Sequence, residues 1–195
     1  MNILRETLFW IPLLWHWPFL MLCRLSSRRS IIEKDRLQWY IKVLRTQRQP
    51  NLRDDFQLSL LPEYRSLCYS RMGGLRRLTQ WYLPGQSLLA LARPQEYYGA
   101  GLVIHHGGNT RLGAVRMGEN CEVWHNVTLG VGSHDNDDRP TIGNHVKIFT
   151  GATIAGKVTI GDYAVIGAGC VVLEDIPANA VVYAEKPKIR INQSR

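Results

Sequence analysis

The chain has few cysteines, and no two of them lie close together in the sequence. Four cysteines occur among 195 residues, and none belongs to a C-x-x-C pair. A disulfide framework or a zinc site built from cysteine pairs needs such spacing, so neither is supported. Cys121 and Cys170 fall at the small inward position of the repeat described below, which predicts buried thiols in a reducing compartment.

A long uninterrupted hydrophobic run is also missing. The most apolar stretch, LFWIPLLWHWPFLMLC at residues 8–23, contains Pro12, His16 and Pro18. A spanning helix needs about 20 apolar residues, so this stretch is too short to cross a membrane comfortably. Its tryptophans and the arginines after them favour contact with a membrane surface through residues 8–29. The competing interpretation is an apolar helix packed on the repeat domain described below or in an oligomer interface. A signal peptide is less well supported, because no small-residue cleavage site follows the apolar stretch.

Acidic residues are scarce in the first half of the chain. Residues 1–98 hold 15 Lys and Arg against 7 Asp and Glu, whereas the remainder holds 9 of each. The whole net charge of +8 therefore lies in the first half, which favours an anionic partner such as a membrane surface. No nucleic-acid-binding motif accompanies these residues, so no nucleic-acid partner is expected. We expect a cytoplasmic protein, with peripheral attachment to the inner face of the cytoplasmic membrane as the alternative.

Two helical segments are predicted ahead of the repeats. Ser30 and Glu33 have capping-box spacing before apolar residues at helical intervals, which predicts a helix over 31–47 that ends before Asn51. A second helical stretch is predicted over 61–83. The expected divisions are an N-terminal segment at 1–29, a helical region at 30–97, a repeat domain at 98–189 and a tail at 190–195.

A six-residue repeat dominates the second half. Aliphatic residues recur every six positions, at Ile142, Ile148, Ile154, Ile160, Ile166 and Val172. Each is followed four residues later by a small or apolar residue. A helix would drift out of phase with this spacing, and a single strand would alternate every second residue. A hexapeptide β-solenoid fits, because each hexad is one short strand plus a turn and the aliphatic residues stack about 4.8 Å apart. The fold class is therefore mainly β.

The repeat extends upstream with two irregularities. Hexads are predicted to start at Tyr98, Ile104, Thr110, Met117, Val123 and Leu129, with one extra residue between Thr110 and Met117. The loop VGSHDNDDRP, at 131–140, fits no repeat. Because short repeats bury a core only by stacking, we expect the solenoid to be capped and to form an oligomer.

The register of the repeat predicts a column of side chains that begins with two histidines. His106 is the third residue of the hexad that starts at Ile104, and His125 is the third residue of the hexad one coil later. The same column then holds Thr150 and Ala168, so a shallow channel should follow the imidazoles. A lone histidine in a β protein is more often structural. A shared column favours catalysis, since neutral imidazole can take a proton from a hydroxyl near neutral pH.

Four segments carry a resemblance to a known family: GLVIHHGGNT (101–110), WHNVTLG (124–130), DDRPTIG (137–143) and VIGAGCVVLEDIPANAVV (165–182). They resemble the serine acetyltransferase family within the hexapeptide-repeat acyltransferases, over residues 60–189. The resemblance looks closest to the serine acetyltransferase-like enzymes of surface and exopolysaccharide synthesis. It implies a left-handed parallel β-helix after a small helical region, a homotrimer, acetyl-CoA as donor, no metal, and an active site between adjacent subunits.

The resemblance also implies roles for single residues. His106 falls on the family's catalytic histidine, which would deprotonate the acceptor hydroxyl as it attacks the thioester held beside it. The oxyanion would be stabilised by His125 or by a backbone N–H. Contacts to coenzyme A are implied for Thr150, Ala168 with the adjacent Gly169, and Lys188.

Departures from the family pattern concern the acceptor. Leu91 stands where the family has an aspartate that orients the catalytic histidine, so Glu96 or a backbone carbonyl is expected to take that role. His105 replaces an aspartate that helps to bind serine. Arg139 is kept in the inserted loop, but Pro140 follows it directly where the family has a histidine, and the C-terminal motif is altered to AEKPKI. We expect His105 and Arg139 to bind the acceptor, a sugar hydroxyl in surface polysaccharide synthesis, with free serine as the alternative.

Two other classes of function stay open. A zinc enzyme like a γ-class carbonic anhydrase uses three histidines shared across a trimer interface. His106 and His125 could supply two ligands, but neither His134 in the loop nor His145 in a turn is well placed as the third. A non-enzymatic solenoid scaffold predicts that His106→Ala changes no measurable property.

Overall fold

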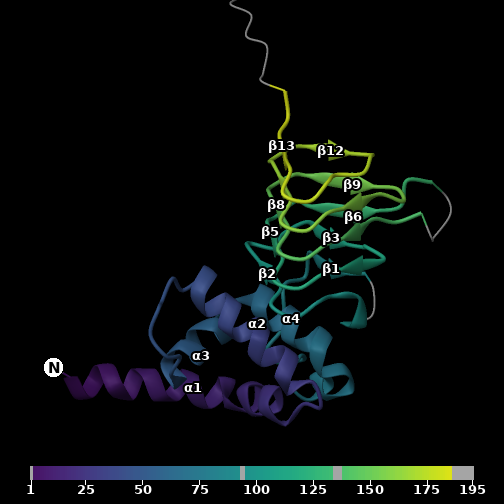
Figure 1. Ribbon diagram of the computed structural model, residues 1–195. Coiled ribbons are helices and arrows are strands. Elements are labelled where there is room, and N and C mark those ends of the chain that lie inside the picture. The colour runs from purple at the N-terminus through teal and green to yellow at the C-terminus, as the bar shows by residue number, and fades with distance from the viewer. Residues whose placement is uncertain (1, 93–94, 134–137, 186–195) are drawn as a thin grey trace, which may run out of the picture.

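The computed structural model describes residues 2–92, 95–133 and 138–185, with side chains from residue 12 onward. Helices occupy the first half, and a stack of short strands rises from them in the second (Figure 1). The helices are α1 (Asn2–Leu25), α2 (Arg29–Lys42), α3 (Leu52–Leu60), α4 (Pro62–Met72), and the 3-10 helices η1 (Gly73–Leu78) and η2 (Gln95–Tyr97). Figure 1 shows α1 lying at the opposite end of the molecule from the last strands.

The start and end of α2 differ from the prediction. The residue before the helix is Arg28, which makes no side-chain cap, and Ser30 lies inside the helix, so the predicted capping box is wrong. The helix ends at Lys42 rather than at residue 47. Arg45 takes a left-handed φ of 53°, a conformation that cannot continue a right-handed helix.

Helix α3 was not predicted, because Asn51 was interpreted as the end of a helix. Asn51 instead begins one: its side chain accepts a hydrogen bond from Asp54 N (3.1 Å), and the Asp54 carboxylate accepts one from Asn51 N (2.9 Å). This reciprocal pair satisfies two backbone donors that the first turn of a helix leaves unpaired.

The predicted helical stretch over 61–83 is present only in its first half as an α-helix. Pro62 stands at the start of α4, where its missing N–H costs nothing. At Gly73 the backbone adopts a φ of 59°, and the chain continues as η1 and then as turns. Glycine enters this left-handed region readily, so it ends the helix here.

The strands of the second half form three parallel sheets, as the repeat predicts. Within the described residues, one sheet has the order β1-β3-β6-β9-β12, a second β10-β7-β4 and a third β13-β11-β8-β5-β2. The strands are β1 (Leu89–Leu91), β2 (Val103–Ile104), β3 (Thr110–Leu112), β4 (Arg116–Met117), β5 (Glu122–Val123), β6 (Thr128–Gly130), β7 (Thr141–Ile142), β8 (Lys147–Ile148), β9 (Thr153–Ala155), β10 (Thr159–Ile160), β11 (Val165–Ile166), β12 (Val171–Val172) and β13 (Val181–Val182).

The pairing of β3 corrects one hexad of the predicted repeat. Leu112, not Thr110, pairs with Leu129 and fills its column. The spacing from Ile104 to Leu112 is therefore eight residues instead of six, and the extra residues lie in the turn that contains His106. The stack also begins earlier than residue 98, because Leu91 of β1 pairs with Leu112.

The inward columns of the solenoid are buried. Ile148 and Ile154 have no exposed surface, and the predicted core thiols Cys121 and Cys170 are 0% and 4% exposed. Burial raises the pKa of the Cys121 thiol to about 12. All four cysteines are free and buried.

A buried ion pair joins the helices to the first coil of the solenoid. Arg71 of α4 donates from Nε to Asp35 Oδ2 of α2 (3.0 Å), and both side chains are almost fully buried. Arg71 also donates to the carbonyl oxygens of Tyr98 (2.6 Å) and Gly99 (2.7 Å). The Asp35 carboxylate accepts from Gly101 N (2.7 Å). Two helices thus satisfy backbone groups at the end of the stack, where no preceding coil covers them.

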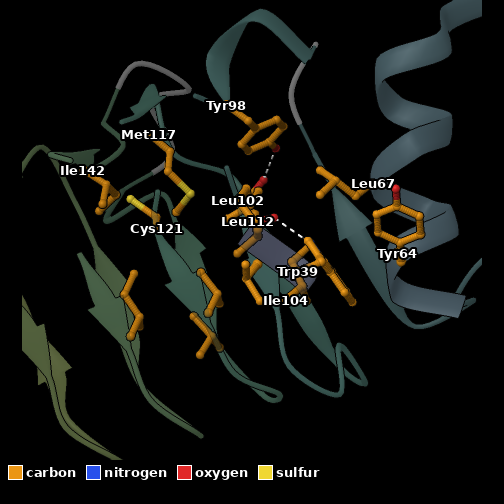
Figure 2. Packing of buried hydrophobic residues seen from close by; sticks show 14 of the residues in the cluster. Trp39, Tyr64, Leu67, Tyr98, Leu102, Ile104, Leu112, Met117, Cys121 and Ile142 are labelled. Atoms are coloured by element: carbon orange, nitrogen blue, oxygen red, sulfur yellow. Dashed lines mark hydrogen bonds between the residues drawn. The ribbon is translucent and has the colours of Figure 1, made fainter. Parts of the chain in front are cut away.

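Aromatic packing strengthens the same junction. Trp39 of α2 donates from Nε1 to the carbonyl oxygen of Leu102 (2.8 Å). Figure 2 shows Trp39 between the α4 side chains Leu67 and Tyr64 and the first solenoid residues. Tyr98 also lies in this core, and its hydroxyl donates to the carbonyl oxygen of Leu112 (2.6 Å). The helical region therefore caps the solenoid.

Candidate active site

The structure places His106 and His125 in one column. The strands before them pair in register, Ile104 with Val123, and the ring centroids lie 6.3 Å apart with their planes at 69°. The pairing continues through β8 and β11, so Thr150 and Ala168 follow in the same column. This corner, between the sheets of β2 and β3, is where the sequence pattern predicted the site.

The backbone at His106 is unusual. His106 has a left-handed φ of 54°, whereas in the later coils the left-handed residue is one position further, at Asn126, Gly151 and Gly169. Its carbonyl oxygen accepts a hydrogen bond from the N–H of Gly108, which closes a tight turn. The longer turn carries an exposed imidazole at its tip. Left-handed residues recur in the turns of this solenoid, among them His145 and Tyr163, so the φ of His106 follows from its place in a turn.

The two imidazoles have few partners within the chain. Among the described residues, no hydrogen bond to the His106 ring is found, and His125 Nδ1 is buried with no partner. Buried polar atoms are normally hydrogen-bonded, so the unpaired Nδ1 of His125 is an exception to that rule.

The positions that follow the histidines form an open strip of small groups. Thr150 accepts a hydrogen bond at its carbonyl oxygen from Gly169 N (2.9 Å), and Ala168 is exposed. A Cβ added to Gly169 would meet no atom within 4 Å. The positions predicted to line a channel are thus occupied by small residues at the surface.

His105 belongs to an aromatic stack beside this column. Its ring lies 4.3 Å from that of Trp124, and Trp124 lies 4.3 Å from Phe149, each pair close to parallel. His105 Nε2 is 3.3 Å from Glu122 Oε2. The side chain at 105 is therefore held in place by stacking on one face and by a carboxylate at its edge.

Glu122 is a charged residue of this site that the sequence reasoning missed. Its carboxylate also contacts Lys42 Nζ of α2 (3.0 Å) and Lys147 Nζ of the next coil (3.7 Å). Burial of the carboxyl favours its neutral form, but the hydrogen bonds from His105 and Lys42 and the charges of both lysines prevail and lower its pKa to about 2. The register could have found it, since Glu122 pairs with Lys147 on adjacent outward positions.

Glu96 is not brought to the His106 imidazole. Its carboxylate is 62% exposed and lies 3.9 Å from Arg28 Nη2. It lines a different cavity, of about 610 Å³, that includes Leu89 and Leu91. No hydrogen bond or ion pair joins Glu96 to His106 among the described residues, so the expected orienting role has no geometric support in this chain.

Arg139 lies at another corner of the triangular coil. Its Nη1 donates to the carbonyl oxygen of Gly113 (3.1 Å), in the turn between β3 and β4. The adjacent Asp138 carboxylate accepts from Lys157 N (2.6 Å), which fixes the end of the inserted loop on the next coil. Within one chain, the structure does not bring Arg139 to the histidine column. Lys188 and His134 lie outside the described residues.

The remaining described histidine of the solenoid, His145, lies at the third corner, where its ring stacks on Tyr163 at 4.5 Å. Within the described ranges, no three His, Cys, Asp or Glu side chains lie together as a possible metal-ligand set.

The comparisons with known proteins agree on a family. The family described as bacterial transferase hexapeptide (six repeats) matches residues 139–174. A serine acetyltransferase of Helicobacter pylori is 31% identical over 153 residues, which cover 73% of this chain and 90% of that protein. A protein of Escherichia coli K12 named as a colanic acid biosynthesis acetyltransferase, WcaB, is 36% identical over 94 residues, which cover 48% of this chain and 58% of that one.

Solved structures agree on the fold. The crystal structure of a Brucella abortus serine acetyltransferase in complex with coenzyme A matches with a TM-score of 0.57 at 22% identity, covering 87% of this chain and 70% of that chain. This match and the repeat family confirm the predicted left-handed parallel β-helix with a helical N-terminal region. The chain therefore belongs to the serine acetyltransferase family and is an acyltransferase built on hexapeptide repeats.

Proposed function

We propose that the protein transfers an acetyl group from acetyl-CoA to an acceptor hydroxyl, with His106 as the general base. The observation that carries this proposal is the column in which His106 and His125 are followed by an open strip of small residues. The names of its relatives support acetyl transfer, and the Brucella abortus protein of this fold binds coenzyme A.

The reaction needs no covalent enzyme intermediate. His106 accepts the hydroxyl proton while the acceptor oxygen attacks the thioester carbonyl. The tetrahedral intermediate collapses with cleavage of the carbon–sulfur bond, and the imidazolium returns the proton to the departing thiolate. In this proposal His125 or a backbone N–H donates a hydrogen bond to the oxyanion, and holding both substrates side by side supplies much of the rate enhancement.

The column above the histidines is the proposed path of coenzyme A. Thr150, Ala168 and Gly169 are small and leave room there for the pantetheine arm. Lys188 is kept as a proposed contact for the phosphate end. We also propose a homotrimer, in which the Arg139 corner of one subunit faces the histidine corner of its neighbour. Light scattering of the purified protein tests this assembly.

A sugar hydroxyl is the acceptor that the local chemistry favours. Free serine carries an ammonium group, which needs an anionic partner. The aspartate expected for that role is His105 here, and the neighbouring Glu122 is already engaged by Lys42 and Lys147. A neutral sugar needs no such anionic partner, and the half-buried ring edges of the His105–Trp124 stack offer it apolar contact instead. Acetylation of a surface polysaccharide precursor is the corresponding role.

Free serine is the second candidate, and the relatives favour it. The Helicobacter pylori serine acetyltransferase matches over 90% of its length, whereas the WcaB match covers 58% of that protein. A serine acceptor predicts that the ammonium group finds a carboxylate contributed from outside the described residues of one chain.

An acceptor screen separates the two candidates. Release of free thiol from acetyl-CoA is followed with serine, simple sugars and nucleotide sugars. The proposal predicts transfer to at least one sugar and none above background to serine. His105→Asp, which restores the family residue, should raise transfer to serine, and His145→Asp at another corner should not. Efficient transfer to serine by the unaltered protein, with every sugar inactive, would refute the sugar assignment and leave the acetyl transfer standing.

A further inference from the structure

Helix α1 is apolar on its outward face as well as on its buried face. Leu13 and Phe19 are buried against the other helices, while Leu14 and Trp15 are 71% and 59% exposed. His16, which is polar, points inward, and its Nδ1 lies 2.8 Å from Ser59 Oγ. A surface helix of a water-soluble domain carries its polar residues outward, so the arrangement in α1 is reversed.

A second segment, distant in sequence, extends this surface. Leu78 at the end of η1 is 61% exposed, and Trp81 in the following turn is 79% exposed. The Tyr82 ring packs edge-on against Trp15 and against Trp81, with centroids 5.1 Å apart in both pairs. We call the exposed set Leu14, Trp15, Leu78 and Trp81 the apolar base.

An apolar groove runs between the two segments. It has a volume of about 540 Å³, and its described lining consists of apolar and aromatic side chains together with Thr79. Figure 1 shows α1 at the end of the molecule away from the solenoid. The apolar base therefore belongs to the end of the protein that is opposite the last coils.

Unpaired cations accompany the apolar base. Arg76 and Arg77 directly precede Leu78 and are exposed, and neither has an ion-pair partner among the described residues. The net charge of the first half of the chain is positive as well. Tryptophan rings prefer the headgroup level of a bilayer, and arginines attract anionic lipids. In the described part of the chain, no helix combines the length and the hydropathy that crossing a bilayer requires.

We propose that the apolar base docks on an anionic phospholipid surface and lies in the interface without crossing it. The charge of the flanking arginines and the aromatic composition favour a lipid surface over a second copy of this chain, whose own base would carry the same positive charge. Docking would leave the solenoid exposed to solvent and present it to acceptors near the membrane. This inference does not depend on which acceptor the enzyme uses.

Vesicle flotation of the full chain tests the proposal. The protein should float with phosphatidylcholine vesicles that contain phosphatidylglycerol, and much less with phosphatidylcholine alone. The double variant Leu14→Glu/Trp81→Glu should bind about ten-fold or more weakly, because it removes two large apolar side chains from the interface. Leu173→Glu, on an equally exposed leucine of the solenoid, is the matched control and should bind as the unaltered protein does.

A charge variant gives an independent arm. Arg76→Glu/Arg77→Glu should lose the preference for anionic vesicles, as surface charge attraction requires. Flotation that is absent for the unaltered protein, or unchanged in both double variants, would overturn the proposal. So would a loss of oligomer size in Leu14→Glu/Trp81→Glu without any vesicle binding, since a second copy would then cover the base. Thiol release from acetyl-CoA in the same samples shows whether enzyme activity survives, so the two proposals fail separately.

Discussion

The solenoid and the helical region keep their cores together in different ways. The solenoid stacks identical aliphatic positions, such as Ile142 on Ile160, and each coil satisfies the backbone of the next. The helical region buries charges instead, with the Arg71–Asp35 pair fully enclosed between two helices and the first coil. Repetition therefore stabilises the stacked coils of the solenoid, whereas the first coil depends on a specific polar cap from the helices.

Removal of Arg71 should have the largest effect on the stability of the polar cap. Arg71→Leu leaves the Asp35 carboxylate buried without its cation and strands the carbonyl groups of Tyr98 and Gly99. We expect a loss of about 3–5 kcal/mol in the free energy of unfolding, measured by urea denaturation. Lys34→Ala is the matched control, since Lys34 also links α2 to the solenoid through Glu119 but is 62% exposed, and it should cost at most about 1 kcal/mol.

The double variant Arg71→Leu/Asp35→Leu tests whether the unpaired carboxylate causes the loss of stability. Replacing both charges removes the unpaired carboxylate but still leaves the backbone groups of Tyr98, Gly99 and Gly101 without partners. Only part of the lost stability should therefore return if burial of an unpaired charge contributes to the loss. Equal losses in Arg71→Leu and Lys34→Ala would contradict the distinction between a buried cap and a surface contact.

A smaller loss of stability is expected at low pH, where Glu122 becomes protonated. Contacts with His105 and Lys42 lower the pKa of Glu122 from 4.5 to about 2, so the folded state favours its ionised form. This contribution is complete above the unfolded pKa and is lost as the pH falls through the folded pKa. Relative to Glu122→Gln, the native protein should lose up to ~3 kcal/mol between about pH 5 and pH 2. Parallel stability curves for the two proteins in that window would contradict the assignment.

The smallest predicted effect concerns the start of α3. Asn51→Ala removes a side-chain cap and should cost about 1 kcal/mol in thermal or urea unfolding. Ser30→Ala is the control, because Ser30 has capping-box spacing in the sequence but lies inside α2 without capping it. A larger cost at Ser30 than at Asn51 would contradict the observed helix boundaries.

The sequence predicted the solenoid because its period is visible in a single chain. It predicted that Ile104 and Val123 occupy the same column, and hence that His106 and His125 share a position. It misassigned Thr110. Counting hexads in a single sequence does not show whether the extra residues of this coil lie before or after β3. Only the pairing of Leu112 with Leu129 settles where they lie.

The helical region was predicted less well, because its contacts are not local. The Asp35–Arg71 pair joins residues that are 36 positions apart, and nothing in the intervening sequence marks them as partners. The Asn51 cap does have a local signal, but the proline before it also fits a helix end. The sequence suggests Glu96 or a backbone carbonyl as the group that orients His106, and within this chain the Glu96 carboxylate lies 3.9 Å from Arg28 Nη2.

The central claim is that His106 is the general base of an acetyl transfer, and the kinetics of His106→Ala test it most directly. With an active acceptor from the screen, we expect kcat for thiol release to fall by about 10²–10⁴-fold, with KM for acetyl-CoA and the oligomer size unchanged. His145→Ala, at another corner of the same solenoid, should retain full activity. A His106→Ala protein that transfers acetyl groups at the rate of the unaltered enzyme would contradict the account.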